Sequence, residues 1–288
     1  MRSEELPYSR FDSPCMRKID QLGWTEGFSF TSFGLKFGIR SNSVELLERA
    51  KENLPPGAKL NGPRRVDYLY SIGAGGEAHG KVGRRLNLLY RDFDLLARGR
   101  KIDGFFDTFE SDLRLTVAYA ATDRVFVHAG AVGWHGKAII IPGRSYSGKS
   151  TLVAELVRAG ATYYSDEYAV LDDQGRVHPF AKPLSMRYDD TGRQTSVAPE
   201  ELGGRSGKQA LPVGLVLVSQ YREGARWRPR QLTPGRGALE MLANTVSARR
   251  RPEVALSTLN QVASRAIVLK SSRGEAARTA ELVLGSLA

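Results

Sequence analysis

The sequence predicts an α/β fold, in which a small N-terminal α+β unit precedes a larger α/β domain. A short β-branched run at residues 137–142 leads into a glycine-rich loop, and a helical spacing of apolar residues follows the loop. Further along the chain, patterns of buried strands alternate with patterns of amphipathic helices. The N-terminal part shows the same two patterns, of strands and of a helix, over a shorter stretch of the chain.

Two segments precede the larger domain. Residues 1–27 are expected to form an irregular arm, because proline and glycine interrupt every periodic run in them. Residues 28–85 are expected to form the small α+β unit, with strands at 28–39 and 66–72 and a helix at 44–54. Pro55 ends that helix, because proline cannot continue it. Neither segment contains a motif that indicates chemistry.

Residues 86–288 are expected to form the larger domain. Residues 86–97 and 103–121 have the pattern of helices or of a strand and a helix that lead into it. The strands expected after them lie at 124–132, 137–142, 161–165, 169–172, 211–218 and 266–270, and the helices at 151–158, 238–244, 254–263 and 275–287. This order of elements is typical of an α/β domain.

Composition and charge narrow the functional classes. The chain of 288 residues has a net charge of +11, which favours acidic partners such as nucleotides or acidic peptides. Its basic residues are scattered and do not alternate with aromatic residues, so nucleic acid is not the favoured partner. No apolar run is long enough to span a bilayer, and no apolar segment near the start resembles a secretory signal. With Cys15 as the single cysteine, we expect a cytoplasmic protein without disulfides.

The segment Gly143-Arg-Ser-Tyr-Ser-Gly-Lys-Ser150 matches the phosphate-loop motif G-x-x-x-x-G-K-[ST] at every fixed position. Its context also fits, since a buried strand precedes it and a helix follows it. Inward-facing backbone N–H groups and the helix N-terminus would hold the phosphates of ATP, and Lys149 would reach the β- and γ-phosphates. The residues expected to bind the nucleotide are Gly143, Arg144, Ser145, Tyr146, Ser147, Gly148, Lys149, Ser150 and Thr151.

An acidic pair supplies candidate ligands for Mg²⁺, together with the hydroxyl of Ser150. Asp166 follows the strand at 161–165, sixteen residues beyond Ser150. Glu167 is adjacent, and in an extended segment its side chain would point the other way. We therefore expect only one of the two carboxylates to face the phosphates, and Asp166 is the better placed.

The segments 127–132, 138–160 and 165–170 together resemble the core of the HPr kinase/phosphorylase family, and the layout as a whole resembles HPr-kinase-related proteins without the full bifunctional machinery. The resemblance implies the P-loop kinase fold with a mixed sheet that this family shares with phosphoenolpyruvate carboxykinase. It implies that Asp166 accepts the proton of an attacking serine hydroxyl or holds a metal-bound water. It also places His128 near the γ-phosphate and gives catalytic roles to His128, Lys149 and Asp166.

The sequence departs from the family at several positions. Tyr146 stands where the family usually has a third loop glycine, and Glu167 replaces an aspartate. The glycine-rich signature of the family is not recognisable in residues 178–187, so phosphorylase activity is not expected. Arg187 and Arg236 are candidates for contacts with the transferred phosphate, with surface arginines as the alternative.

The favoured function is an ATP- and Mg²⁺-dependent kinase that phosphorylates a hydroxyl, by resemblance a serine, of a protein or peptide. A small-molecule kinase and a nucleotide-binding or ATPase module without phosphotransfer remain alternatives. The enzymes that the chain resembles assemble into oligomers, so the resemblance leaves a homo-oligomer open. The sequence does not name the acceptor.

Overall fold

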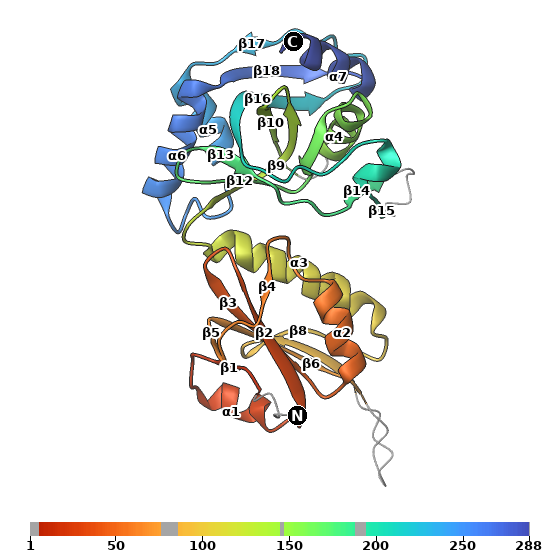
Figure 1. Cartoon of the computed structure of the whole chain (residues 1–288), viewed down its shortest axis with the longest axis vertical. Helices are drawn as coiled ribbons and strands as arrows, with labels where there is room; N and C mark the ends of the chain where they lie inside the picture. Colours follow the sequence, from red (N-terminus) through yellow and green to blue (C-terminus); the bar gives the residue numbers. More distant parts are fainter. Residues whose placement is uncertain (1–5, 76–85, 145–146, 188–193, 288) are drawn as a thin grey trace. The chain divides into compact units, whose positions relative to one another are not determined.

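The computed structural model describes residues 6–75, 86–144, 147–187 and 194–287 (Figure 1). It is a mixed α/β protein with several sheets, which confirms the fold class at this level. The chain divides into two compact units, Met1–Thr122 and Asp123–Ala288. This boundary differs from the one expected after residue 85, because the segment from 86 to 121 belongs to the first unit.

The first unit is built on a six-stranded sheet with the order β4-β2-β3-β6-β7-β8. Its strands β3 and β6 are parallel, and the other neighbours are antiparallel. The strands are β2 (Glu26–Ser32), β3 (Leu35–Ser41), β4 (Lys59–Leu60), β6 (Tyr68–Gly73), β7 (Asn87–Arg91) and β8 (Asp94–Gly99). The long helix α3 (Asp103–Ala120) completes the unit beside α2 (Val44–Glu52), and the Arg49 guanidinium of α2 lies 4.3 Å from the Phe106 ring centre of α3.

The N-terminal segment is packed rather than loosely attached. Strand β1 (Tyr8–Ser9) pairs in parallel with β5 (Arg65–Val66), and α1 (Pro14–Asp20) follows it. The expectation of an irregular arm therefore fails for its described residues. Apolar contacts explain why, because Met16 of α1 is buried in a small cluster with Val66 and Leu69.

The second unit is built on an eight-stranded mixed sheet with the order β10-β9-β12-β13-β16-β18-β17, and β11 also pairs with β9. A further pairing joins β10 to β16, so that β10, β9, β12, β13 and β16 form a closed ring of paired strands. Strands β10, β16 and β18 are parallel to one another. The strands are β9 (Val125–Trp134), β10 (Lys137–Pro142), β11 (Thr162–Ser165), β12 (Tyr168–Leu171), β13 (Arg176–His178), β16 (Leu211–Tyr221), β17 (Arg230–Gln231) and β18 (Ile267–Arg273).

Helices cover both faces of this sheet. Figure 1 shows α4 and α7 on one side and α5 and α6 on the other. Each pair packs on its own apolar cluster, one containing Leu152, Leu156 and Val283 and the other containing Met241, Leu259 and Val262. The helices are α4 (Lys149–Arg158), α5 (Pro234–Leu242), α6 (Pro252–Arg265) and α7 (Ala276–Gly285). In the sequence between α4 and α5 lie the hairpin of β14 (Leu184–Arg187) and β15 (Gln194–Val197) and a short 3₁₀ turn, Pro199–Leu202, whose apolar residues join the cluster of α4 and α7.

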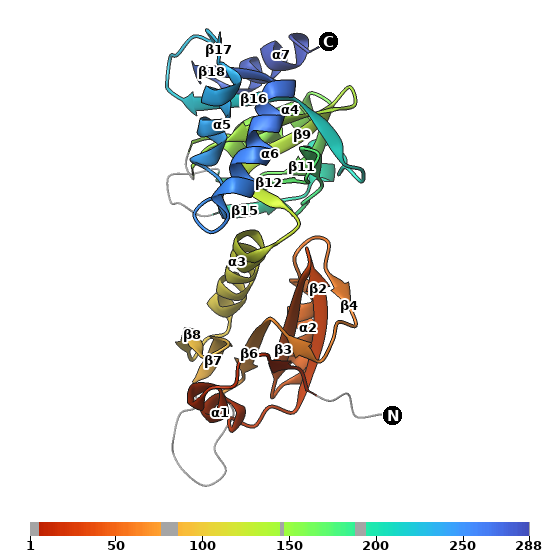
Figure 2. The same ribbon diagram turned by 90° about the vertical axis from the view of Figure 1, so that its left-hand side faces the viewer.

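The two views in Figures 1 and 2 show the elements of each unit from perpendicular directions. Residues 86–97 contribute to the antiparallel strands β7 and β8 rather than to a helix, because the chain reverses at Asp92, whose φ is 51°. None of the described helices is long and apolar enough to cross a membrane.

Candidate functional site

The glycine-rich loop lies between the end of β10 and the first residue of α4, as the motif requires. Gly148 caps α4 with φ at 80°, a left-handed conformation that favours glycine. A Cβ at Gly148 would lie 2.4 Å from Nη2 of Arg273, and one at Gly143 would lie 2.8 Å from Oγ of Ser147. Both glycines are therefore needed for the loop to keep this shape.

Lys149 is buried at the start of α4. Its Nζ donates a hydrogen bond of 2.8 Å to the backbone carbonyl of Arg144, within the same loop. Burial lowers the pKa of Lys149 to about 8, and the nearby charge of Asp166 partly opposes this shift. A buried ammonium at a helix N-terminus can offset the charge of a bound phosphate.

Ser150 and Asp166 lie together, as the sequence predicts. The Ser150 hydroxyl donates to Oδ2 of Asp166 over 3.2 Å, and the backbone N–H of Ser185 donates to the same oxygen over 2.9 Å. The Tyr163 hydroxyl is 3.2 Å from Oδ1 of Asp166. Burial and the Asp166 charge raise the pKa of Tyr163, so that this hydroxyl stays a donor. Asp166 is thus buried and held in one position by three donors.

Lys182 joins the two acidic residues. Its Nζ lies 3.4 Å from Oδ1 of Asp166 and 3.7 Å from Oε2 of Glu167. The backbone bends at residues 166 and 167 instead of continuing extended, so both carboxylates reach the same ammonium. This corrects the expectation that the two side chains point in opposite directions. Lys182 itself was missed, although it lies in the segment 178–187 that departs from the family pattern.

His128 lies half-buried on β9, paired with Tyr168 of β12. Its backbone carbonyl accepts a hydrogen bond of 3.2 Å from the N–H of Gly143, the first loop residue. Burial and the positive charge of Lys149 lower the pKa of His128 to about 4, and Asp166 opposes the shift. The imidazole is therefore neutral at pH 7 and lies in the electrostatic field of Lys149 and Asp166.

Arg273, at the end of β18, also holds the loop. Its Nη2 donates a hydrogen bond of 2.7 Å to the carbonyl of Gly148, and its guanidinium lies 5.6 Å from the Tyr221 ring centre. The side chain is fully buried, and burial lowers its pKa. No sequence motif indicated this residue, because it lies 125 positions beyond Gly148.

Five other predicted residues are not placed in the site by the described structure. Ser145 and Tyr146 lie outside the described residues. Arg187 ends β14, and only its backbone is described. Arg236 is exposed in the first turn of α5, and no described ion pair or hydrogen bond joins its side chain to the loop. Thr151 is exposed in α4 directly after Ser150.

The Mg²⁺ expectation fits the oxygens that meet at Ser150 and Asp166. A hydroxyl beside a carboxylate is an oxygen donor set that Mg²⁺ accepts, with water and phosphate oxygens as its remaining ligands. The described residues contain no group of three or more His, Cys, Asp or Glu side chains that could hold a metal by themselves. The arrangement therefore suits a metal that arrives with a nucleotide.

A pocket of about 840 Å³ adjoins the loop. It is lined by the loop residues Gly143, Arg144 and Ser147, by the carboxyl-terminal parts of β16 and β18, and by the end of α5. Because β10, β16 and β18 are parallel, their carboxyl ends meet at this edge of the sheet, where α/β proteins bind ligands. We refer to this cavity as the loop pocket.

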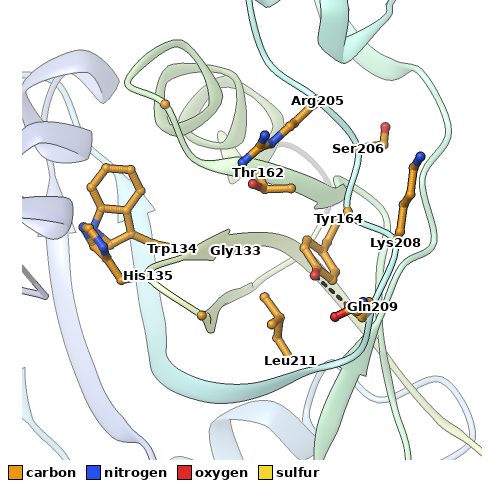
Figure 3. Close-up of a pocket in the computed structure, with 13 residues that line it drawn as sticks. Gly133, Trp134, His135, Thr162, Tyr164, Arg205, Ser206, Lys208, Gln209 and Leu211 are labelled. Atoms are coloured by element: carbon orange, nitrogen blue, oxygen red, sulfur yellow. Dashed lines mark hydrogen bonds between the residues drawn. The ribbon is translucent and has the colours of Figure 1, made fainter.

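A second cavity, of about 670 Å³, lies at the other end of β10 (Figure 3). The hairpin residues Trp134 and His135 and the tyrosine Tyr164 line it, and the Tyr164 hydroxyl donates to the carbonyl of Gln209 over 2.7 Å. His135 occupies the tight turn between β9 and β10 with φ at 45°. This cavity is remote from the loop along the strand and does not belong to the candidate site.

Comparison of the chain with protein-family models gives no match, and comparison with curated proteins gives none either.

Proposed function

We propose that this protein is an ATP-dependent kinase that transfers the γ-phosphate to a hydroxyl group, with a serine of a protein or peptide as the favoured acceptor. The observation that carries the proposal is the contact between Ser150 and Asp166 directly below the phosphate loop. This contact joins Ser150, which follows Lys149, to the buried carboxylate of Asp166, which lies between β11 and β12. The mixed sheet of the second unit is compatible with the P-loop kinase fold of the HPr kinase type, which we propose with it.

Each side chain has a distinct task in this reaction. The loop N–H groups and Lys149 would hold and neutralise the β- and γ-phosphates, and Ser150 and Asp166 would hold Mg²⁺. Bound Mg²⁺ would offset negative charge on the phosphate oxygens. The acceptor hydroxyl oxygen forms a bond to the γ-phosphorus while the bond to the bridging oxygen of ADP breaks. The hydroxyl proton passes to Asp166, which is held in place by Tyr163 and Ser185.

His128 supports the reaction without carrying charge. Since its pKa is about 4, it is neutral at the pH of the reaction and adds no cation beside Lys149. Its backbone fixes the first loop residue through the bond to Gly143. The role favoured for its side chain is a hydrogen bond to a γ-phosphate oxygen, as the family resemblance implies.

The test combines nucleotide binding with label transfer. Purified full-length protein is incubated with Mg²⁺ and ATP labelled at the γ-phosphate, and label is sought in protein, peptide and metabolite fractions. We expect Lys149→Ala to weaken ATP binding by about tenfold or more, since it removes a charge-assisted contact worth about 1.5–3 kcal/mol. Lys208→Ala removes an exposed lysine from the remote cavity and should leave binding unchanged.

Two results would contradict the proposal. Unchanged ATP affinity in Lys149→Ala would mean that the loop does not bind phosphate. Hydrolysis of ATP with no transfer of label to any fraction would identify a nucleotide-hydrolysing module, and transfer only to a metabolite would identify a small-molecule kinase.

A further inference from the structure

The loop pocket carries an excess of positive charge. Arg144, Arg226, Arg228, Arg230 and Lys270 line it, and Glu240 is the acidic side chain among its described lining residues. Glu240 forms an ion pair with Lys270, which leaves the arginines to set the charge of the pocket. Charge of one sign inside a concave surface raises the local concentration of ligands of the opposite sign.

Three of these arginines, Arg226, Arg228 and Arg230, occupy alternate positions of one segment, and all three line the pocket. Trp227, which lies between two of them, does not line it. The flanking apolar residues identify the two faces. Trp227 packs against the apolar cluster of α4 and α7, whereas Leu232 belongs to the cluster of α5 and α6. The three arginines share the face of Leu232, towards the end of α5 that lines the pocket.

Strand β18 holds this segment in place. The N–H of Arg228 donates a hydrogen bond of 3.1 Å to Oγ of Ser271, and Arg230 pairs with Lys270 across the β17–β18 ladder. Like charges opposite each other in a sheet are unfavourable. In the described part of the chain, no carboxylate forms an ion pair with Arg226, Arg228 or Arg230, and all three are exposed. The three guanidinium groups are therefore accessible to an anionic ligand.

The nucleotide does not account for this charge. Its phosphates are matched by Lys149, Ser150 and the N-terminus of α4, which do not line the pocket, and by the backbone of Gly143, Arg144 and Ser147, which lines only one end of it. Its base and ribose are uncharged, and the described lining includes no aromatic ring on which a base could stack. The charge also extends along a row, because three arginines spread over four residues of chain can span up to about 13 Å. A row of that length fits an extended segment with several negative charges better than one phosphate group.

We propose that the loop pocket binds the acceptor and that the acceptor is an acidic peptide segment, whose glutamate or aspartate side chains pair with Arg226, Arg228 and Arg230. This inference rests on the proposed kinase function and names its substrate class. The pocket begins at Gly143, Arg144 and Ser147, so a peptide bound along the arginine row reaches the loop that holds the γ-phosphate. The arginines select and orient the peptide, and the transfer itself falls to the residues around Asp166.

The test compares two labelled peptides, each with a central serine. In one peptide glutamates flank the serine, and in the other lysines do. We expect the full-length protein to bind the acidic peptide at least about tenfold more tightly, in fluorescence anisotropy and at low salt. Combined Arg226→Glu, Arg228→Glu and Arg230→Glu should remove this preference, and ATP affinity should be unchanged.

A matched variant controls for total charge. Combined Arg98→Glu, Arg100→Glu and Lys101→Glu reverses three exposed charges in the first unit and should keep the preference for the acidic peptide. Equal binding of both peptides, or loss of the preference in both variants, overturns the inference. A weakened ATP affinity in the pocket variant with unchanged peptide binding assigns the arginines to the nucleotide and also overturns it. These results leave the proposed function intact, whereas ATP binding that does not depend on Lys149 refutes both.

Discussion

The two sides of the phosphate loop differ in how their charges are satisfied. On the side of Asp166, the charged groups are buried or nearly so and contact one another at fixed distances, with Lys182 between the two carboxylates. On the side of the loop pocket, three arginines are exposed and form no ion pair with a described carboxylate. Buried and paired groups are already in position for chemistry. Exposed cations in a concave surface are suited to capturing a ligand from solution.

The largest effect is expected from a substitution on the Asp166 side of the loop. Asp166→Asn keeps the size of the side chain and removes its ability to accept a proton. We expect phosphate transfer to fall by about 10²–10⁴-fold, the usual contribution of a general base. ATP binding, measured by calorimetry, should change little. Glu167→Gln is the matched control, and its effect on transfer should be much smaller, because Glu167 has no contact with Ser150 in the described site.

If both variants lose transfer equally, the two carboxylates act as one unit and the distinction between them is wrong. If Asp166→Asn also abolishes ATP binding, the proposed role of Asp166 as a base is not supported, and its role is to hold Mg²⁺ or the surrounding structure. Circular dichroism of both variants is needed, since removing one partner of a buried ion pair costs about 3–5 kcal/mol when no water can replace it.

Arginines in the two environments provide a second test. Arg273→Met removes the donor to the Gly148 carbonyl, and we expect ATP affinity to fall by about tenfold, the equivalent of one charge-assisted hydrogen bond. Arg228→Met removes an exposed arginine of the loop pocket and should leave ATP affinity unchanged. Arg273→Lys should recover part of the loss, because its ammonium can donate to one carbonyl.

Equal effects of Arg273→Met and Arg228→Met on ATP affinity would contradict the distinction between a buried positioning residue and an exposed ligand-binding residue. A thermal melt of each variant separates loss of the fold from loss of loop geometry.

The smallest expected effect is a pH dependence of ATP binding. Lys149 has a lowered pKa of about 8 and is a cation only below that pH. ATP affinity should therefore be constant below about pH 7.5 and fall as pH rises through 8, approaching tenfold per unit. His128, with a pKa of about 4, is neutral throughout this range and adds nothing to the profile.

Lys149→Arg is the control for this profile, because arginine keeps its charge at every pH tested. Its absolute affinity will be lower, but the fall above pH 8 should disappear. A profile that is the same for lysine and arginine would assign the titration to another group.

Local patterns explain what the sequence could predict. The loop, Lys149, Ser150 and Asp166 were predictable because the motif fixes residues that are adjacent in the chain, and a short strand places Asp166 next to them. Lys182 and Arg273 were not, because their roles depend on contacts across long separations in the sequence, 125 residues in the case of Gly148 and Arg273.

The same reasoning covers the domain boundary and the basic pocket. The apolar pattern of α3 shows that it packs on something, but it does not show that the partner is the sheet of β6, where the Tyr70 hydroxyl donates to Asp112 over 2.7 Å. The alternation of Arg226, Arg228 and Arg230 is visible in the sequence, yet only the pairing of β17 with β18 shows which side of the sheet they face.

The closed ring of strands has a mechanical consequence for the loop. Strand β10 is hydrogen-bonded along both edges, to β9 and to β16, so the loop begins from a support that cannot slide in either direction. A rearrangement near the loop is therefore expected outside β10. Strand β17 is the strand at the end of the sheet path, and it pairs with β18 over two residues. The fold thus combines a strand paired along both edges, directly before the loop, with a short strand paired over two residues beside the loop pocket.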